Sequence, residues 1–268
     1  ATGAIERPLI FSNNDRPGII LSSSIKKYID YYGVKTGENI SLFTNNDSAY
    51  ETAISLNKSG VKIKVIIDIR ENPSSILSEK IEKAGIKILR GYTITNTDGY
   101  KRIKSIDVMK LSKDGGSVVG NKVTYKCDCL GISGGWTPMV HLFTQSGGKL
   151  KFKNNDNVFI PDENKTPSKQ ISVGSSNGDF ELDDVINNTV KNIKIFLGLD
   201  KNDYENLNIK CSKEKEKRNL WLLPSDKPIS NTKLFLDFQN DSTAKDVKLA
   251  LREGFKSIEH VKRYTTTG

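Results

Sequence analysis

The sequence predicts an α/β protein of the Rossmann type, in which one nucleotide-binding-like domain is inserted into another. Three observations predict this fold. A complete βαβ unit lies between Glu38 and Asp68, an antiparallel meander follows over residues 92–133, and short glycine motifs stand at strand ends before and after this insertion. A βαβ unit of about 30 residues is the repeating piece of dinucleotide-binding folds.

The first elements alternate between helix and strand. Residues 19–33 predict a helix ended by Gly33, with a serine among residues 22–24 able to cap an N-terminus. A strand begins at Glu38, and after a turn at residues 44–47 a helix covers residues 48–59. The nearly continuous apolar run from Val61 to Asp68 is typical of a buried parallel strand.

A helix over residues 73–83 and a strand over residues 86–89 follow. Strands are then predicted over residues 92–97, 102–111 and 122–133, and the turns Asp98-Gly99 and Asp114-Gly115-Gly116 separate them as hairpin loops do. Within the last of these strands, Cys127 and Cys129 are expected on the same face as two small buried side chains.

The rest of the chain is predicted to contain fewer regular elements. A loop-rich part leads to a strand over residues 169–174 and to a helix over residues 182–197. The charged residues 198–230, in which residues 213–218 alternate in sign, are typical of a linker with a solvated surface. A strand over residues 234–238 and two helices complete the chain, from about Thr243 and from about Ser257.

The composition argues against several classes of function. The net charge of +9 is spread along the chain and interleaved with acidic residues, which argues against nucleic-acid binding. No run approaches the roughly 20 apolar residues of a membrane helix. Three cysteines without a disulfide pattern suit a reducing, cytoplasmic setting, and no metal site is expected. No Ser-His-Asp or Cys-His set can be assembled around His141 or His260, so no catalytic residue is predicted.

The turn of the complete βαβ unit lacks the glycines of a dinucleotide site. Thr44, Asn46 and Ala49 stand where a GxGxxG pattern would have them. Side chains at the first two positions should crowd a pyrophosphate, so a second nucleotide there is doubtful and a purely structural βαβ unit is the favoured interpretation. Asp68, with Arg70 beside it, stands where an acidic residue would bind a ribose hydroxyl.

Three other glycine motifs carry the nucleotide hypothesis: Ala1-Thr2-Gly3-Ala4, the stretch from Gly131 to Gly135, and Val173-Gly174-Ser175-Ser176. Each is an ordinary loop by itself, but their order around an inserted domain is that of a two-dinucleotide-binding protein. Small residues at such places let the backbone lie close to a dinucleotide.

These motifs resemble those of the two-dinucleotide-binding flavoproteins related to glutathione reductase. Longer stretches narrow the likeness: ATGAIERPLIFSNNDRPGI, LFTNNDSAY, SGGWTPMVHLFTQSGGKL and the last 34 residues from Phe235 resemble the alpha subunit of heterotetrameric sarcosine oxidases. The resemblance runs through essentially the whole chain. It implies an internal piece of such a subunit, with the glycine fingerprint preceding Ala1 and a folate domain following Gly268.

The resemblance also implies a domain plan. Residues 1–35 and 120–200 would form part of an outer dinucleotide-binding domain, and residues 36–119 the inserted inner domain with its meander. Residues 201–230 would be the linker, and residues 231–268 a small helical domain similar to an iron–sulfur module. In that module Asp237 and Gln239 stand where thiolate ligands would be needed, so no two-iron cluster is expected.

The family implies NAD in this segment, with contacts at Thr2, Gly3, Gly174 and Ser175. It implies FAD, flavin mononucleotide and tetrahydrofolate elsewhere in a complex with beta, gamma and delta subunits, where the beta subunit oxidises sarcosine. As an isolated fragment the chain is expected to bind nucleotide poorly.

Three alternatives stay open. One is a subunit of another FAD- or NAD-dependent amine or amino-acid oxidase or dehydrogenase, with dimethylglycine among the possible substrates. Another is a pyridine-nucleotide disulfide oxidoreductase, which requires a CxxC pair that this chain lacks. The third is a non-catalytic scaffold whose nucleotide sites have decayed.

Overall fold

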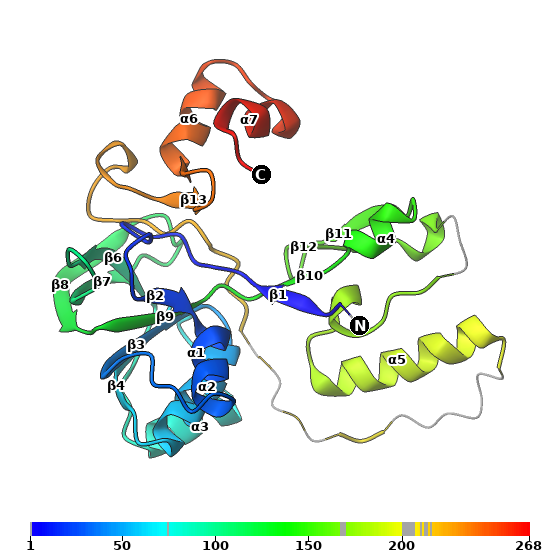
Figure 1. The fold of residues 1–268 in the computed structure, drawn as a ribbon, viewed down its shortest axis with the longest axis horizontal. Coiled ribbons are helices and arrows are strands. Elements are labelled where there is room, and N and C mark those ends of the chain that lie inside the picture. Colours follow the sequence, from blue (N-terminus) through cyan, green and yellow to red (C-terminus); the bar gives the residue numbers. More distant parts are fainter. Residues whose placement is uncertain are drawn as a thin grey trace.

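The computed structural model describes residues 2–73, 75–166, 170–199, 207–209, 211, 214 and 216–268. Its largest part is a parallel sheet of five strands in the order β2-β9-β3-β4-β5 (Figure 1). The strands are β2 (Ile19–Leu21), β9 (Cys129–Ser133), β3 (Asn39–Thr44), β4 (Lys62–Asp68) and β5 (Ile88–Arg90). A fully parallel sheet is normally covered on both faces, and both faces of this sheet are covered.

Three helices cover one face of this sheet: α1 (Ser22–Asp30), α2 (Ser48–Lys58) and α3 (Ile76–Lys83). Apolar residues of the strands, such as Leu42 and Ile66, form one buried cluster with Ile25, Ala53 and Leu56 of the helices. Gly131 in β9 lets α1 come close, because a Cβ there would stand 2.7 Å from Ile25 Cδ1.

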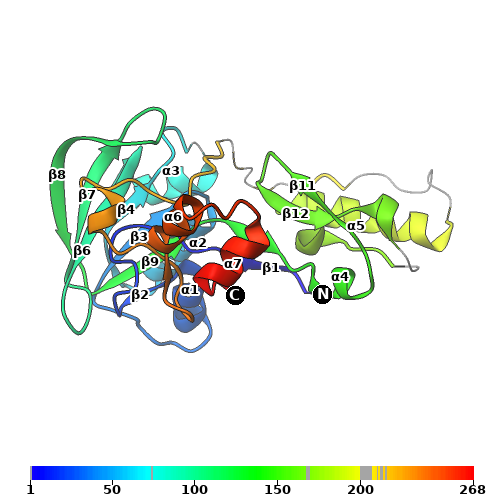
Figure 2. The ribbon, with the colours of Figure 1, turned by 90° about the horizontal axis from the view of Figure 1, so that it is seen from above.

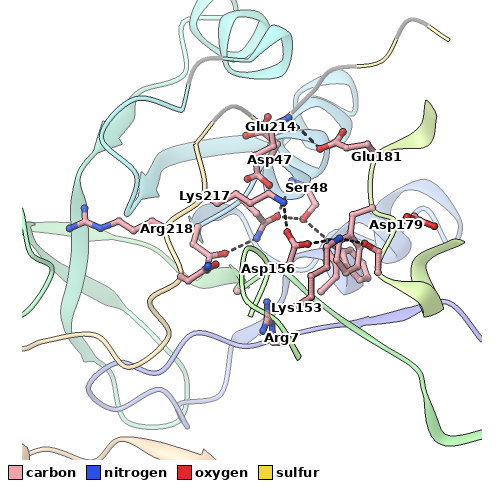
Figure 3. Close-up of a pocket in the computed structure, with 18 of the residues that line it drawn as sticks. Arg7, Asp47, Ser48, Lys153, Asp156, Asp179, Glu181, Glu214, Lys217 and Arg218 are labelled. Carbon is pink, nitrogen blue, oxygen red and sulfur yellow. Dashed lines mark hydrogen bonds and ion pairs between the residues drawn. The ribbon is translucent and has the colours of Figure 1, made fainter. Parts of the chain in front are cut away.

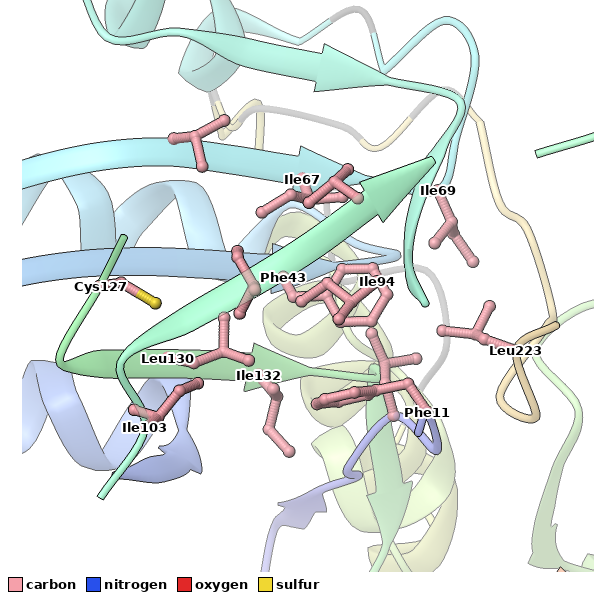
Figure 4. Close-up of a cluster of buried hydrophobic side chains, with 14 of the residues drawn as sticks. Phe11, Phe43, Ile67, Ile69, Ile94, Ile103, Cys127, Leu130, Ile132 and Leu223 are labelled. Carbon is pink, nitrogen blue, oxygen red and sulfur yellow. The ribbon is translucent and has the colours of Figure 1, made fainter. Parts of the chain in front are cut away.

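An antiparallel meander covers the other face. It consists of β6 (Tyr92–Asp98), β7 (Ser105–Leu111) and β8 (Val118–Lys126). The alternate residues of the central strands, Phe43 and Ile67, pack here against Ile94 of the meander and Phe11 of the N-terminal segment (Figure 4). Alternation along each strand therefore divides its side chains between the helix layer and the meander layer.

Two strand predictions need correction. Residues 19–21, expected in a helix, form β2, because they pair in parallel with Leu130–Ile132 of β9. The strand expected over 122–133 breaks at Asp128, whose carboxylate accepts the N–H groups of Glu38 and Asn39. As a result Cys127 and Cys129 do not share a face: both are buried, but in different clusters.

A second lobe contains short strands and one long helix (Figure 2). Strand β1 (Ala4–Glu6) pairs with β10 (Trp136–Pro138), and β11 (Leu150–Lys153) forms a hairpin with β12 (Val158–Pro161). Helix α4 (His141–Gln145), the 3₁₀ turns η1 (Glu163–Lys165) and η2 (Gly174–Asn177), and α5 (Leu182–Leu197) complete it.

The strand expected over 169–174 does not form in residues 170–173, since none of the described strands lies beside them to supply hydrogen bonds. Lys169 lies outside the described residues. Strands β2 and β9, which the predicted domain plan assigns to the outer domain, pair with each other, and β9 also pairs with β3 of the predicted inner domain.

The C-terminal residues form a separate unit. A short hairpin, β13 (Phe235–Asp237) and β14 (Ser242–Thr243), leads into α6 (Ala244–Arg252) and α7 (Ile258–Thr265), and η4 (Ile229–Asn231) precedes it. Thr243 and Asp246 form a capping box at the start of α6. Among the described residues, no helix is both long and apolar enough to cross a membrane.

Candidate functional site

A pocket lies at the carboxyl ends of β3 and β9. In the strand order the chain continues from β3 to β4 on one side and returns as β9 on the other, so this is the switch point where open α/β sheets bind ligands. The pocket encloses about 250 Å³. Its described lining residues are Arg7, Asn45, Asn46, Asp47, Ser48, Glu51, Gly134, Gly135, Trp136, Lys153, Asp156, Gly178, Asp179, Phe180, Glu181, Asp184, Glu214, Lys217, Arg218, Asn219 and Trp221.

The turn at the end of β3 is filled by the chain's own polar groups. The Asn46 side-chain carbonyl accepts the backbone N–H of Ser48, the first residue of α2, at 3.0 Å. Its amide nitrogen donates to the carbonyl and hydroxyl oxygens of Ser133, at 3.2 and 3.0 Å. Asn46 thus occupies the Ser48 N–H group, which a glycine-rich turn would leave free for a pyrophosphate.

Behind this turn, the buried guanidinium of Arg70 contacts three carboxylates. Asp68 at the end of β4 accepts from Arg70 Nη2 at 2.7 Å. Arg70 Nη1 lies 2.8 Å from an oxygen of Asp47 and 2.6 Å from an oxygen of Glu214. The Tyr50 hydroxyl donates to Asp68 at 2.7 Å, which leaves Asp68 committed to protein partners and not open to a ribose.

The side chains of this ion-pair cluster are almost fully buried. The side chains of Arg70 and Asp68 are 0% exposed, and those of Asp47 and Glu214 are 13% and 17% exposed. Burial raises the pKa of Glu214 to about 7, although Arg70 opposes this. Burial also raises the pKa of Glu181, whose carboxylate accepts the backbone N–H of Glu214.

The pocket as a whole is acidic. Its described lining residues include seven carboxylates and four basic side chains. The ammonium groups of Lys153 and Lys217 both pair with Asp156, and these ion pairs lower the pKa of Asp156 against the opposing effect of its burial (Figure 3). Arg218 is bound by three backbone carbonyl oxygens. An acidic lining in which Lys153 and Lys217 are already paired with Asp156 is unsuited to a pyrophosphate.

Residues expected in a solvated linker supply one wall of this pocket. These residues are Glu214, Lys217, Arg218, Asn219 and Trp221. Glu216 does not line the pocket, but its carboxylate accepts the N–H groups of Glu71 and Asn72 at 3.2 and 2.5 Å. Trp221 donates from Nε1 to the Gly134 oxygen at 2.6 Å, and the Arg7 guanidinium lies 4.3 Å from its ring centroid. Of the alternating charges that indicated a solvated surface, Glu214 pairs with the buried Arg70 and Lys217 with the buried Asp156, both far away in sequence.

The four residues predicted to contact NAD lie away from the pocket. Thr2 is exposed, and its hydroxyl donates to the Met139 oxygen at 3.1 Å. Gly3 follows it with φ +67° and open space where a side chain would be, just before β1. Gly174 and Ser175 begin η2, which contacts β10, the partner of β1. The structure therefore places both predicted pairs in the same lobe, near β10.

Gly174 does not begin a long helix. Helix α5 starts eight residues later, and Glu181, Asp183 and Asp184 surround its first turn. An acidic first turn repels a phosphate, so any contact from this region comes from the backbone of η2. Gly174 has φ +68°, a conformation that favours glycine.

In the C-terminal unit, the Asp237 carboxylate collects hydrogen bonds. It accepts the N–H groups of Gln239, Asn240 and Gly268, at 2.8, 3.2 and 3.0 Å. With the Asn240 side chain these bonds lower the pKa of Asp237 to about 2. Among the described residues there is no group of three or more side chains suited to hold a metal ion.

The sheet order, the switch point and the covering meander define a two-dinucleotide-binding Rossmann-type fold, as the sequence predicts. A solved structure supports the same fold: L-proline dehydrogenase from P. horikoshii aligns with 99% of this chain and 48% of its own, with a TM-score of 0.62 and 17% identity.

Sequence relatives are more specific. Sarcosine oxidase subunit alpha of Corynebacterium sp. strain P-1 is 32% identical over 99% of this chain, and that of Rhizobium meliloti strain 1021 is 31% identical over 100%. Residues 231–268 match the family model of the sarcosine oxidase A3 domain. The resemblance to sarcosine oxidase alpha subunits is therefore confirmed. The chain spans 28% and 26% of the length of these two relatives.

Proposed function

We propose that this chain is the NAD-binding segment of the alpha subunit of a sarcosine oxidase complex, an oxidoreductase. The observation that carries the proposal is the similarity to sarcosine oxidase alpha subunits over nearly the whole chain, together with a two-dinucleotide-binding fold. The complex would demethylate sarcosine to glycine with oxygen and tetrahydrofolate, giving hydrogen peroxide and methylene-tetrahydrofolate.

In this proposal the chain itself carries out no step of amine oxidation. The beta subunit oxidises the amine, and FAD, flavin mononucleotide and tetrahydrofolate are held elsewhere among the alpha, beta, gamma and delta subunits. The cytoplasm is the proposed location, which suits the three free cysteines. NAD is proposed for the lobe that contains Thr2, Gly3, Gly174 and Ser175.

The backbone geometry favours NAD binding in that lobe over NAD binding at the switch point of the inner domain. The open space beside Gly3 leaves its backbone accessible, and Gly174 has only Val185 Cγ1 near its missing Cβ, at 3.6 Å. At the switch point, by contrast, Asn46 fills the turn and Asp68 is bound by Arg70 and Tyr50. NAD, when bound, supplies a nicotinamide ring that can accept a hydride. The role of these residues is to hold and orient it.

The nucleotide content of the complete subunit tests the assignment. The purified subunit is denatured, and the released nucleotide is identified by chromatography and mass spectrometry. We expect NAD in a ratio of about one per chain. Release of FAD would contradict the NAD assignment, and release of no nucleotide would favour a scaffold with decayed sites.

Two substitutions locate the site. Gly3→Val and Gly174→Val should each reduce the NAD retained by the subunit at least about tenfold, because a branched side chain strains the positive φ and covers the backbone. Gly60→Val is the matched control, since Gly60 has φ +69° and open surroundings but lies at the end of α2. Equal losses in all three variants would show a general effect of strain and reject the placement.

A further inference from the structure

The wall of the pocket that contains Glu214 carries an inference that does not depend on NAD binding. Glu214 and Glu216 lie far along the chain from the loop that follows β4, yet both bind it. Arg218 adds a bond from its Nη1 to the Ile69 oxygen at 2.7 Å. The attachment therefore consists almost entirely of polar contacts.

The charges in this attachment do not balance. Arg70 supplies one positive charge to Asp47, Asp68 and Glu214, all largely buried. The other charged groups that face Glu214 are Lys217, which is committed to Asp156, and Glu181, which accepts its backbone N–H. Desolvation penalises each unbalanced charge, so the docked arrangement favours uptake of a proton.

We propose that the contact between Glu214 and Arg70 is a proton-dependent lock, which holds Glu214 and residues 216–218 against the inner domain at acid pH and loosens as the pH rises. Glu214 is the group whose proton affinity changes most on release, because it alone leaves Arg70 with the docking segment, whereas Asp47 and Asp68 stay beside it. Release removes Glu214, Lys217 and Arg218 from the wall of the switch-point pocket, so the lock controls how open that pocket is.

The sign follows from linkage. Docking raises the pKa of Glu214 to about 7, above the ordinary value of a free glutamate. The docked state therefore binds the proton more tightly than the released state, and protons favour docking. Below the ordinary glutamate range both states are protonated and docking is strongest; it weakens as the pH rises through that range to about 7.

Hydrogen exchange of the complete subunit tests the lock. Exchange of the peptides that contain Glu71, Asn72 and residues 216–219 is followed by mass spectrometry at a series of pH values from about 5.5 to 8.5, and each rate is divided by the intrinsic rate at that pH. The wild-type ratio should rise at least about tenfold across the series, which is one unit of pKa difference. A ratio that stays constant would overturn the proposal.

Three variants assign the effect. Glu214→Gln should make the ratio independent of pH, within about twofold, because a neutral amide already satisfies the docked state. Glu216→Gln should raise the ratio by the same factor at every pH and keep the slope, since it only weakens the attachment. Glu82→Gln is the matched control, a partly exposed glutamate paired with Arg90, and should behave as wild type. A slope that persists in Glu214→Gln, or that Glu82→Gln abolishes, would overturn the proposal.

Discussion

At the scale of single residues, the ion pairs of Arg70 determine which side chains are accessible at the switch point. Its guanidinium pairs with Asp68, the residue that would otherwise face a ribose, and with Glu214 from a distant part of the chain. The pairing Asp68–Arg70 is visible in the sequence, but its partners Asp47 and Glu214 are not. Sequence spacing cannot show which carboxylates meet a buried cation, because 144 positions separate Arg70 from Glu214.

Arg70→Leu should destabilise the protein by about 3–5 kcal/mol, because removal of one partner leaves buried carboxylates without a countercharge. Arg90→Leu is the matched control: its pair with Glu82 is more than a third exposed, so it should cost less than about 1 kcal/mol. Urea unfolding followed by circular dichroism measures both. Similar midpoints for the two variants would show that the Arg70 cluster contributes little to stability.

At the scale of elements, local signals worked where an element is complete within a short stretch. The βαβ unit over residues 38–68, α3, α5 and the capped helix α6 lie close to their expected places, because period, caps and glycine stops are local. The predictions were wrong where pairing with a distant strand determines the local structure. Residues 19–21 are a strand only because β9 lies beside them, and residues 170–173 form none.

The caps of the two C-terminal helices differ in a way that can be measured. Thr243 caps α6 through a reciprocal bond with Asp246, whereas Ser257 at the start of α7 makes no side-chain cap bond. Thr243→Ala should cost about 1 kcal/mol, or roughly fivefold faster exchange of α6 amides, and Ser257→Ala should change α7 little. Equal effects on both helices would contradict the role of the capping box.

The same box predicts a dependence on pH. Its hydrogen bonds from Thr243 lower the pKa of Asp246, so the stabilisation is complete above the ordinary aspartate range and is lost as the pH falls through the lowered value. Protection of α6 should therefore decline in acid in the wild type, and Asp246→Asn should flatten that decline.

At the scale of the whole molecule, Trp221 ties three segments together. Its indole N–H bonds to Gly134, its ring lies beneath Arg7, and its backbone oxygen accepts the N–H of Ile10. Arg7, Gly134 and Trp221 all line the pocket, so these contacts form part of its wall. The linker prediction missed them, although an isolated Trp-Leu-Leu run within a charged stretch is a signal for burial.

Trp221→Ala should destabilise the protein by about 3 kcal/mol, and Trp221→Phe by about 1 kcal/mol, because the second variant loses only the hydrogen bond to Gly134. Tyr100→Ala is the control, since Tyr100 is exposed and should change stability very little. Denaturant unfolding measures all three. A neutral Trp221→Ala would mean that the segment after Arg218 is held without its indole.

The sequence by itself determined the Rossmann-type class, the glycine-poor inner turn and the likeness to sarcosine oxidase alpha subunits, since these depend on residue order within short stretches. Tertiary structure alone decided which strands share the parallel sheet, that Cys127 and Cys129 lie in different buried clusters, and that Glu214, Lys217 and Trp221 line the pocket. Each of these depends on hydrogen bonds or burial between segments far apart in the chain, and such pairings leave no periodic trace in the sequence.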